Sequence, residues 1–271
     1  MTDQILNFGV TEASIARDET DGHAEEVRLS GFTVLDSGLS PVEVTHLRDG
    51  IEAVIARQTE EVGGHDVMAR LDEANTGRAM LAYDDRFIEL VRNGPLLALM
   101  ERLLGRYFVL NQQNAIVVQP DDVHHQIRFH RDLPYQHFVS SRPLALNALF
   151  CADPFTLDNG ATFVIPGSHK HEPFPDEAVV RRLQRQVTVP AGGFLVLDAM
   201  TYHRAGINRS AHPRRAINHV FTLPFIRQQI DLPALLKGRY ADDPLLSRLF
   251  GYGLEVPVSV RDWRLARLKR L

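Results

Sequence analysis

Residues 143–168 read PLALNALFCADPFTLDNGATFVIPGS. Two apolar runs of strand length, residues 143–151 and 161–165, are separated by the turn-forming Asp158-Asn-Gly160 and followed by a second turn signal, Pro166-Gly-Ser168. Short strands at this spacing, with turn residues between them, are typical of β-sandwiches and barrels and not of alternating strand–helix units. The stretch therefore predicts a β core.

The same pattern extends along the chain on both sides of this stretch. Further apolar runs of strand length occupy residues 108–118, 186–189, 193–197 and 215–223. The glycine-rich sequences that cradle nucleotide phosphates do not occur. We therefore expect a mainly β fold with flanking helices, whose core covers residues 107–225.

The flanking helices and one short strand are predicted from local signals. Residues 31–35 predict a strand, and Ser40-Pro-Val-Glu43 has the form of a capping box with proline at the first helical position. One helix is expected to follow it, with an apolar face formed by Val42, Leu47, Ile51, Val54 and Ile55. Residues 87–104 predict one or two helices broken near Gly94-Pro95, and residues 244–250 predict another.

No change in composition marks a second domain, so we expect the 271 residues to form one. Its expected parts are a loose N-terminal arm or short helix over residues 1–28, a mainly helical region over 29–106, the β core over 107–225 and a helical tail over 226–271. The tail is expected to pack on the outside of the core.

Composition and charge exclude several classes of protein. Hydrophobic residues make up 44% of the chain and charged residues 24%, as in ordinary globular proteins. The net charge of −4 and the lack of a basic patch argue against a nucleic-acid partner. No run approaches the roughly 20 apolar residues that span a bilayer, so no membrane partner is expected.

Cysteine occurs once, at Cys151, and histidine occurs 12 times. A chain with one cysteine forms no internal disulfide, which fits a reducing compartment and predicts a cytoplasmic location. Any bound metal must then be held by nitrogen and oxygen atoms, so the histidines and carboxylates are the candidate ligands.

The segment Phe129-His130-Arg131-Asp132 is the first candidate for a metal site. Residues two apart on a strand point to the same face, so His130 and Asp132 can aim at one point. His203, which follows the apolar run 193–197, is the candidate third ligand, although alone it reads as a histidine that bonds backbone carbonyls. Two histidines and one carboxylate bind Fe(II) as a facial triad with open positions. Catalytic zinc also often has three protein ligands, so the triad by itself leaves the metal open.

Arg214 lies eleven residues after His203, at the start of an apolar strand that we expect to run back alongside the His203 strand. A guanidinium can grip a carboxylate through two parallel hydrogen bonds. A metal with open positions and a fixed arginine together suit a 2-oxo acid, with its keto end on the metal and its distal carboxylate on the arginine. Arg215 is the competing residue. Neighbouring strand residues face opposite sides, so only one of the two can point inward.

These motifs, together with Asp158-Asn-Gly160 and Pro166-Gly-Ser168, resemble the phytanoyl-CoA dioxygenase family of Fe(II)- and 2-oxoglutarate-dependent oxygenases over about residues 30–225. The resemblance implies a double-stranded β-helix core, also called jelly-roll or cupin-like. It also implies O₂ as a second cosubstrate, and it favours Arg214 over Arg215 as the clamp for 2-oxoglutarate. The implied iron ligands are His130, Asp132 and His203.

The resemblance places Asn147 against 2-oxoglutarate, and it also shows two departures. Some members carry a hydroxyl two residues beyond the second histidine, where this chain has Ala205, so that contact must come from elsewhere or be missing. Between the first histidine and the aspartate many members have glutamine, where this chain has Arg131. We expect Arg131 to face away from the metal and to matter little.

The expected reaction is hydroxylation of an unactivated C–H bond of a small metabolite, with decarboxylation of 2-oxoglutarate to succinate and CO₂. Asp132 argues against a halogenase, because the related halogenases replace this carboxylate with a small residue. One alternative is a cupin-like metal-dependent isomerase or lyase, which needs no arginine clamp. Another is a non-catalytic barrel that binds a metal or a metabolite.

The substrate contacts are expected in loops at the mouth of the barrel, where specificity usually resides. Gln126, Arg128 and Tyr135 flank the candidate metal ligands and are the predicted contacts. Arg128, Arg131 and Arg142 near this mouth would favour an anionic small-molecule substrate. On family grounds alone, we expect a role in specialised metabolism.

Overall fold

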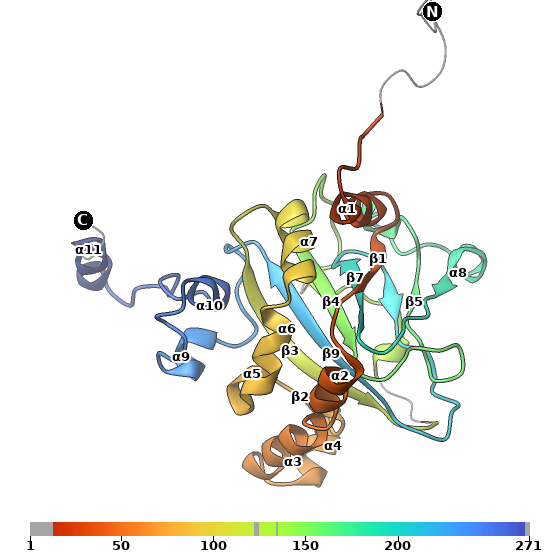
Figure 1. Ribbon diagram of the computed structural model, residues 1–271, viewed down its shortest axis with the longest axis horizontal. Helices are drawn as coiled ribbons and strands as arrows, with labels where there is room; N and C mark the ends of the chain where they lie inside the picture. Colours follow the sequence, from red (N-terminus) through yellow and green to blue (C-terminus); the bar gives the residue numbers. More distant parts are fainter. Residues whose placement is uncertain (1–12, 122–124, 134, 269–271) are drawn as a thin grey trace, which may run out of the picture.

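The computed structural model describes residues 13–121, 125–133 and 135–268 (Figure 1). Its strands form two antiparallel sheets. The larger sheet has the order β1-β7-β4-β9-β3-β2, with β1 Phe32–Asp36, β7 Gly193–Asp198, β4 Ala145–Cys151, β9 Arg214–Thr222, β3 Val109–Val118 and β2 Thr76–Gly77. The smaller sheet has the order β6-β5-β8, with β6 Arg185–Gln186, β5 Phe163–Val164 and β8 His203–Arg204.

The two sheets pack face to face. One buried cluster between them takes Val164 from the smaller sheet and Cys151, Leu195, Leu197 and Ala216 from the larger one. Their interleaved strand order, with β4 paired to β7 on one side and to β9 on the other, is that of a jelly roll. The jelly-roll core expected from the sequence is confirmed.

Helices cover the outer face of the larger sheet (Figure 1). Strand residues of that face, such as Phe150, Phe194 and Phe221, pack with apolar residues of the helices in the main core. The described helices are α1 Glu19–Ser30, α2 Pro41–Arg48, α3 Ile51–Glu61, α4 His65–Arg70, α5 Met80–Tyr83, α6 Ile88–Val91, α7 Gly94–Leu104, α8 Glu177–Leu183, α9 Leu232–Leu236, α10 Pro244–Phe250 and α11 Val260–Leu268. Of these, α4, α8 and α11 place no residue in the main core. This layer leaves the inner face of the barrel free for the site.

The capping box at Ser40 is confirmed, because Ser40 and Glu43 exchange side-chain-to-backbone hydrogen bonds at the start of α2. The single helix expected after it is wrong. The chain forms two helices, α2 and α3, separated at Asp49-Gly50. Val42, expected on the apolar face, is 78% exposed, whereas Val44 in the same helix is buried. A glycine costs about 1 kcal/mol in a helix interior, which favours the break at Gly50.

Of the two forms expected for residues 1–28, a loose arm or a short helix, the helix occurs from Glu19 onward. Helix α1 begins after Asp18, whose side chain caps Asp21 N, and ends at Gly31, which has a φ of 86°. Its residues Ala24 and Val27 are buried. Residues 1–12 of the expected arm lie outside the described residues.

The tail packs only in part. Helices α9 and α10 bury Leu236, Leu249 and Phe250 against the main core. Helix α11 buries no residue and lies away from the barrel (Figure 1). Among the described helices, none is long and apolar enough to cross a bilayer.

Candidate metal centre

His130 and His203 lie on neighbouring strands of backbone at the edge of the smaller sheet. The amide of each donates to the carbonyl of the other, at 3.0 and 3.1 Å, which extends that sheet beyond β8 by one isolated bridge. The segment 130–132 is therefore not the regular strand expected from the sequence. The bridge and the hydrogen bond from Asp132 N to the Ala199 carbonyl, at 3.1 Å, nevertheless hold the backbone extended. The side chains of His130 and Asp132 therefore point to the same face, as predicted.

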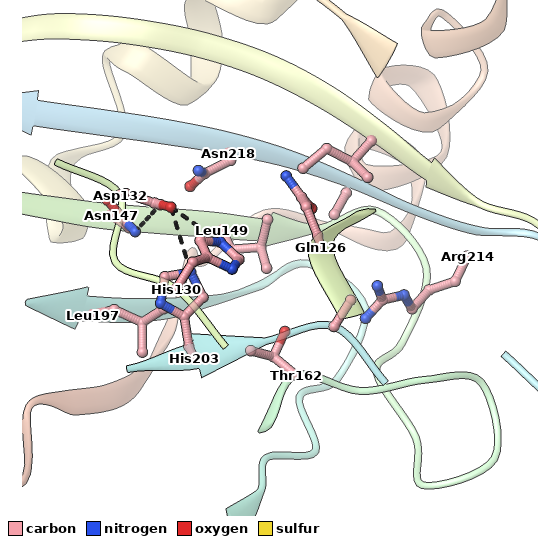
Figure 2. A pocket seen from close by; sticks show the side chains of 13 residues that line it. Gln126, His130, Asp132, Asn147, Leu149, Thr162, Leu197, His203, Arg214 and Asn218 are labelled. Carbon is pink, nitrogen blue, oxygen red and sulfur yellow. Dashed lines mark hydrogen bonds and ion pairs between the residues drawn. The ribbon is translucent and has the colours of Figure 1, made fainter. Parts of the chain in front are cut away.

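The three candidate ligands converge on one point (Figure 2). Asp132 Oδ1 lies 3.3 Å from His130 Nε2 and 3.6 Å from His203 Nε2. The other ring nitrogen of each histidine bonds a backbone carbonyl at 2.9 Å, His130 Nδ1 that of Arg128 and His203 Nδ1 that of Thr201. Such bonds fix the tautomer and direct Nε2 toward a metal. The donor set of two imidazoles and one carboxylate fits a divalent first-row metal.

Burial and mutual attraction set the charges of this cluster. Burial by itself raises the pKa of Asp132, but the nearby His203 and His130 and the Asn147 amide outweigh it and hold the pKa at about 2. Burial lowers the pKa of His203 in spite of the nearby Asp132 charge. Asp132 is therefore ionised and His203 favours its neutral form, which are the states that bind a metal.

Arg131 points away from the cluster, as expected, but it does matter to the structure. Its side chain is 2% exposed and lies 3.9 Å from the ring centroid of Tyr202. Its guanidinium makes five hydrogen bonds of 2.5–3.2 Å, to the backbone carbonyls of Gln136, Ser168, His171, Glu172 and Met200. An arginine has five N–H donors, so all are used.

Those five carbonyls belong to three loops that surround the metal cluster. The Met200 carbonyl lies between Ala199 and His203, on the loop that carries the second histidine. The expectation that Arg131 matters little is wrong. Arg131 lies between two candidate ligands, His130 and Asp132, and its hydrogen bonds connect their segment to these three loops. No local sequence signal marks this role, because all five acceptors of the guanidinium are backbone carbonyls and four of them lie 37 to 69 residues away.

Arg214 lies at the start of β9, in the larger sheet, whereas His203 begins β8 in the smaller one. The expectation that the two strands run side by side is therefore wrong. The connection between them crosses from one sheet to the other, held by Asn208, whose side chain donates to the carbonyls of Val118 and His212. Arg214 consequently faces the metal cluster across the cavity, with Thr162 and Gln126 between them in Figure 2.

The Arg214 guanidinium is buried, and two of its three nitrogens have no hydrogen-bond partner among the described residues. The residue is 4% exposed, and its Nε and Nη1 atoms are buried and donate to no atom of the described protein. The ring of Phe155 covers it at 4.0 Å. Burial lowers its pKa to about 10, so it is still a cation at neutral pH. Arg215 points the other way and pairs with Asp153 and Glu52.

A buried cation with orphaned donors fits an anionic ligand that the protein alone does not supply. The distal carboxylate of a 2-oxo acid satisfies this requirement, because it accepts two parallel N–H bonds. The residues of the cavity therefore fit both a metal and 2-oxoglutarate.

Asn147 and Thr162 complete the cavity wall. Asn147 Nδ2 donates to Asp132 Oδ2, a contact that the sequence did not predict, while its buried Oδ1 has no partner. Ala205 lines the cavity without a hydroxyl. Thr162, on the segment before β5, turns its side chain into the same space and offers one instead (Figure 2).

The cavity has a deep part and a mouth that meet at the metal cluster. Arg214, Thr162 and Asn147 line the deep part, and Arg78, Gln112 and Gln136 line the mouth. Both parts share Ile116, Gln126, His130, Asp132 and Asn218.

Of the three predicted substrate contacts, two line the cavity and one does not. Gln126 lines both parts of the cavity and Arg128 lines the mouth. Tyr135 is 66% exposed and is not among the described residues that line either part. Arg142 lines a separate pocket with Arg102 and Lys170, and the guanidinium of Arg131 is fully bonded. Two of the three arginines behind the expected anionic substrate are thus turned away from the mouth.

A jelly-roll barrel that holds two histidines and a carboxylate at its mouth, with open positions on the metal, is the arrangement of non-haem iron oxygenases. The chain matches the model of the family described as phytanoyl-CoA dioxygenase (PhyH) over residues 27–216. The protein belongs to this family, whose members are Fe(II)- and 2-oxoglutarate-dependent oxygenases acting on small molecules.

The chain is similar in sequence to curated relatives and in fold to solved structures. An uncharacterized protein of Mycobacterium tuberculosis is 34% identical over 207 residues, 74% of each chain. The iron/alpha-ketoglutarate-dependent dioxygenase penM of Penicillium thymicola is 33% identical over 96 residues, 32% of this chain and 30% of that one.

The solved structures share the fold at low identity. The non-heme monooxygenase ThoJ in complex with Ni has a TM-score of 0.60 at 20% identity, covering 77% of this chain and 80% of its own. The alpha ketoglutarate dependent epimerase SnoN from nogalamycin biosynthesis has a TM-score of 0.58 at 18% identity, covering 76% and 83%.

Proposed function

We propose that this oxygenase hydroxylates a C–H bond of a small metabolite and that His130, Asp132 and His203 hold its iron. The observation that carries the proposal is the convergence of three ligand atoms at one end of a cavity whose other end holds a buried guanidinium, with two nitrogens that bond no described residue. In the proposed reaction, substrate C–H, O₂ and 2-oxoglutarate give the alcohol, succinate and CO₂, with the oxidising power supplied by iron and its cosubstrates.

The protein orients the cosubstrate through the deep part of the cavity. Arg214 donates to the distal carboxylate, and the Thr162 hydroxyl takes the place of the one missing at Ala205. The apolar side chains of Leu149, Leu197 and Ala216 line the space between and keep water out. Low polarity strengthens the pairing of Arg214 with a carboxylate.

Asn147 positions the carboxylate ligand. Its amide holds Asp132 Oδ2, which leaves Oδ1 directed at both histidine Nε2 atoms. Its Oδ1 is buried and has no partner among the described residues, and this supports our proposal that Asn147 also contacts 2-oxoglutarate. The mouth of the cavity receives the substrate on the other side of the metal.

Two alternatives predict different results. An isomerase or lyase of the cupin type has no use for the buried cation at Arg214, and an inert binding barrel has no use for a complete ligand set. Other outcomes of the same chemistry, such as desaturation or epimerisation, are separated from hydroxylation by product mass. Hydroxylation adds one oxygen atom, whereas desaturation removes two hydrogens and epimerisation leaves the mass unchanged.

The test is anaerobic titration of the protein with Fe(II) and 2-oxoglutarate, followed by addition of O₂ and measurement of succinate. We expect a visible absorption band of iron-bound 2-oxoglutarate and succinate formation. Asp132→Ala and His203→Ala should abolish both, and Arg214→Gln should raise the 2-oxoglutarate requirement about a hundredfold, since it removes a charge-assisted bidentate contact. Arg215→Gln is the matched control. An effect confined to Arg215→Gln, or no succinate from the wild type, would contradict the proposal.

We also propose a cytoplasmic place of action. The single cysteine, Cys151, is buried and unpaired, and a reducing compartment suits such a thiol.

A further inference from the structure

Carboxamides are the commonest side chains at the mouth of the cavity, six of the fourteen described lining residues. Its volume is about 370 Å³, which suits a small molecule. The amide side chains that line it come from five separate segments: Gln112, Asn114, Gln126, Gln136, Asn218 and Gln229. Among the described lining residues, only Ile116 and Leu133 are aliphatic.

These amides are arranged as a surface for hydrogen bonding. The Asn114 carboxamide contacts Gln112 Oε1 at 3.1 Å and Gln229 Oε1 at 3.0 Å, so the three amides hold one another in place. Each carboxamide has two donors and two acceptor positions, and these contacts use only part of them. Nearer the metal, Asn218 Oδ1 is buried and has no partner in the described protein.

Charge contributes little to this surface. Arg78 is paired with Glu73, and the guanidinium of Arg131 is consumed by carbonyls behind the site. Arg128 is the remaining cation among the described lining residues. The mouth therefore offers many neutral donors and acceptors but no cluster of charge for a polyanion.

We infer that the substrate is a small molecule that presents several uncharged hydrogen-bonding groups, such as hydroxyls or amides, and is not an acyl chain. This inference rests on the proposed function for the position of the substrate next to the metal. An alkyl chain in this mouth would cover polar amide groups such as those of Gln112 and Gln229 and return no hydrogen bonds, which is unfavourable. A hydroxyl both donates and accepts, so a polyol or an amide can satisfy the same groups.

Calorimetry and substrate-stimulated succinate release test the inference. The polar probes are myo-inositol, N-acetylglucosamine and N-acetylasparagine amide, and the apolar probes are octanoate, palmitate and palmitoyl-CoA. We expect at least one polar probe to bind the Fe(II)- and 2-oxoglutarate-loaded protein under anaerobic conditions and to stimulate succinate release in air, with no response to the apolar probes.

Variants connect the binding to the mouth. Gln112→Leu and Gln229→Leu should each weaken binding of the polar probe about tenfold, as expected for amides that bond the ligand. Both should leave the 2-oxoglutarate affinity within twofold of the wild type, which also verifies that they fold. Gln119→Leu removes a carboxamide just beyond β3 that is not among the described lining residues, and should change neither value.

Preferential binding of an acyl probe, failure of all polar probes to bind, or unchanged polar binding in both leucine variants overturns the inference. Failure of the wild type to bind Fe(II) and 2-oxoglutarate overturns the proposed function instead. In that case, calorimetry of the polar probes with the metal-free protein still decides the inference by the same criteria.

Discussion

His130 and His203 are joined by a reciprocal pair of backbone hydrogen bonds, at 3.0 and 3.1 Å, although they are 73 residues apart in the chain (203 − 130). Their side chains lie with ring centroids 4.5 Å apart. The ligand set is therefore assembled by closure of the barrel, and an unfolded chain has no comparable site.

A divalent metal should stabilise the folded protein. A ligand that binds only the native state, at a hundred times its dissociation constant, adds about 2.7 kcal/mol to the free energy of unfolding. For a chain of this size we expect Mn(II) to raise the midpoint of thermal unfolding by about 5 °C or more. EDTA should reverse the shift, and Asp132→Ala should show none. An equal shift in that variant would place the metal elsewhere.

Arg214→Met should make the cosubstrate-free protein more stable. Two of the buried Arg214 guanidinium nitrogens have no hydrogen-bond partner among the described residues, so an apolar side chain of similar length removes an incompletely satisfied cation. We expect the free energy of unfolding, measured with urea, to rise by about 1–3 kcal/mol, while stabilisation by 2-oxoglutarate is lost.

The neighbouring Arg215→Met is the control for this effect. Arg215 is ion-paired to Asp153 and Glu52, so its loss should be neutral or slightly destabilising. A marked loss of stability in Arg214→Met would mean that the guanidinium has protein partners and is not held ready for an anion.

Arg131→Lys should destabilise the protein and weaken metal binding. Lysine has one nitrogen with three donors and cannot reach five carbonyls in three loops. Because the lost bonds are buried, we expect the free energy of unfolding to fall by about 3 kcal/mol or more, and the affinity for Mn(II) to fall tenfold or more. Arg128→Lys, at an exposed position three residues earlier, should have little effect on stability. A stable Arg131→Lys variant with normal metal affinity would show that Arg131 does not position the ligands.

His219 should make stability depend on pH. It is fully buried on the outer face of β9, its Nδ1 donates to the Ala148 carbonyl, and its Nε2 accepts from Gln113, so it is neutral. Burial lowers its pKa from 6.5 to about 4. A depressed histidine pKa contributes stability above pH 6.5, and this contribution is lost as the pH falls from 6.5 through 4.

The loss from His219 amounts to about 3 kcal/mol over that interval. Urea unfolding at pH 7.5 and pH 4.5 should show a smaller difference in His219→Gln than in the wild type. His65→Gln, at the start of α4, serves as the control and should keep the wild-type difference. Equal pH dependence in the His219 variant would indicate that this histidine is not the buried neutral group described.

Local signals predicted much of the fold. The strands β3, β4 and β7 follow from apolar runs bounded by turn residues, and the start of α2 follows from its capping box. Local spacing also brought His130 and Asp132 together. The break at Asp49-Gly50 was missed, because the apolar spacing continues across it.

Features assembled from distant segments could not be predicted in this way. The partner of a strand is set by packing of the whole barrel, so β9 was expected next to β8 and in fact pairs with β3 and β4. The bonds of Arg131 and the carboxamides of the mouth likewise join segments far apart in the sequence. An amide on one strand becomes part of a binding surface only when other strands supply its neighbours.

The alternation at residues 130–132 leaves this segment with a single tolerable register. Shifting it by one residue against His203 would turn both ligands out of the cavity and swing the Arg131 guanidinium into it. A fixed positive charge would then stand where a divalent cation should bind, while five carbonyls behind the site lost their donor. A shifted register is therefore unfavourable for two reasons. The hydrogen bonds of Arg131 that hold the site in place thus also select the register in which this segment pairs with His203.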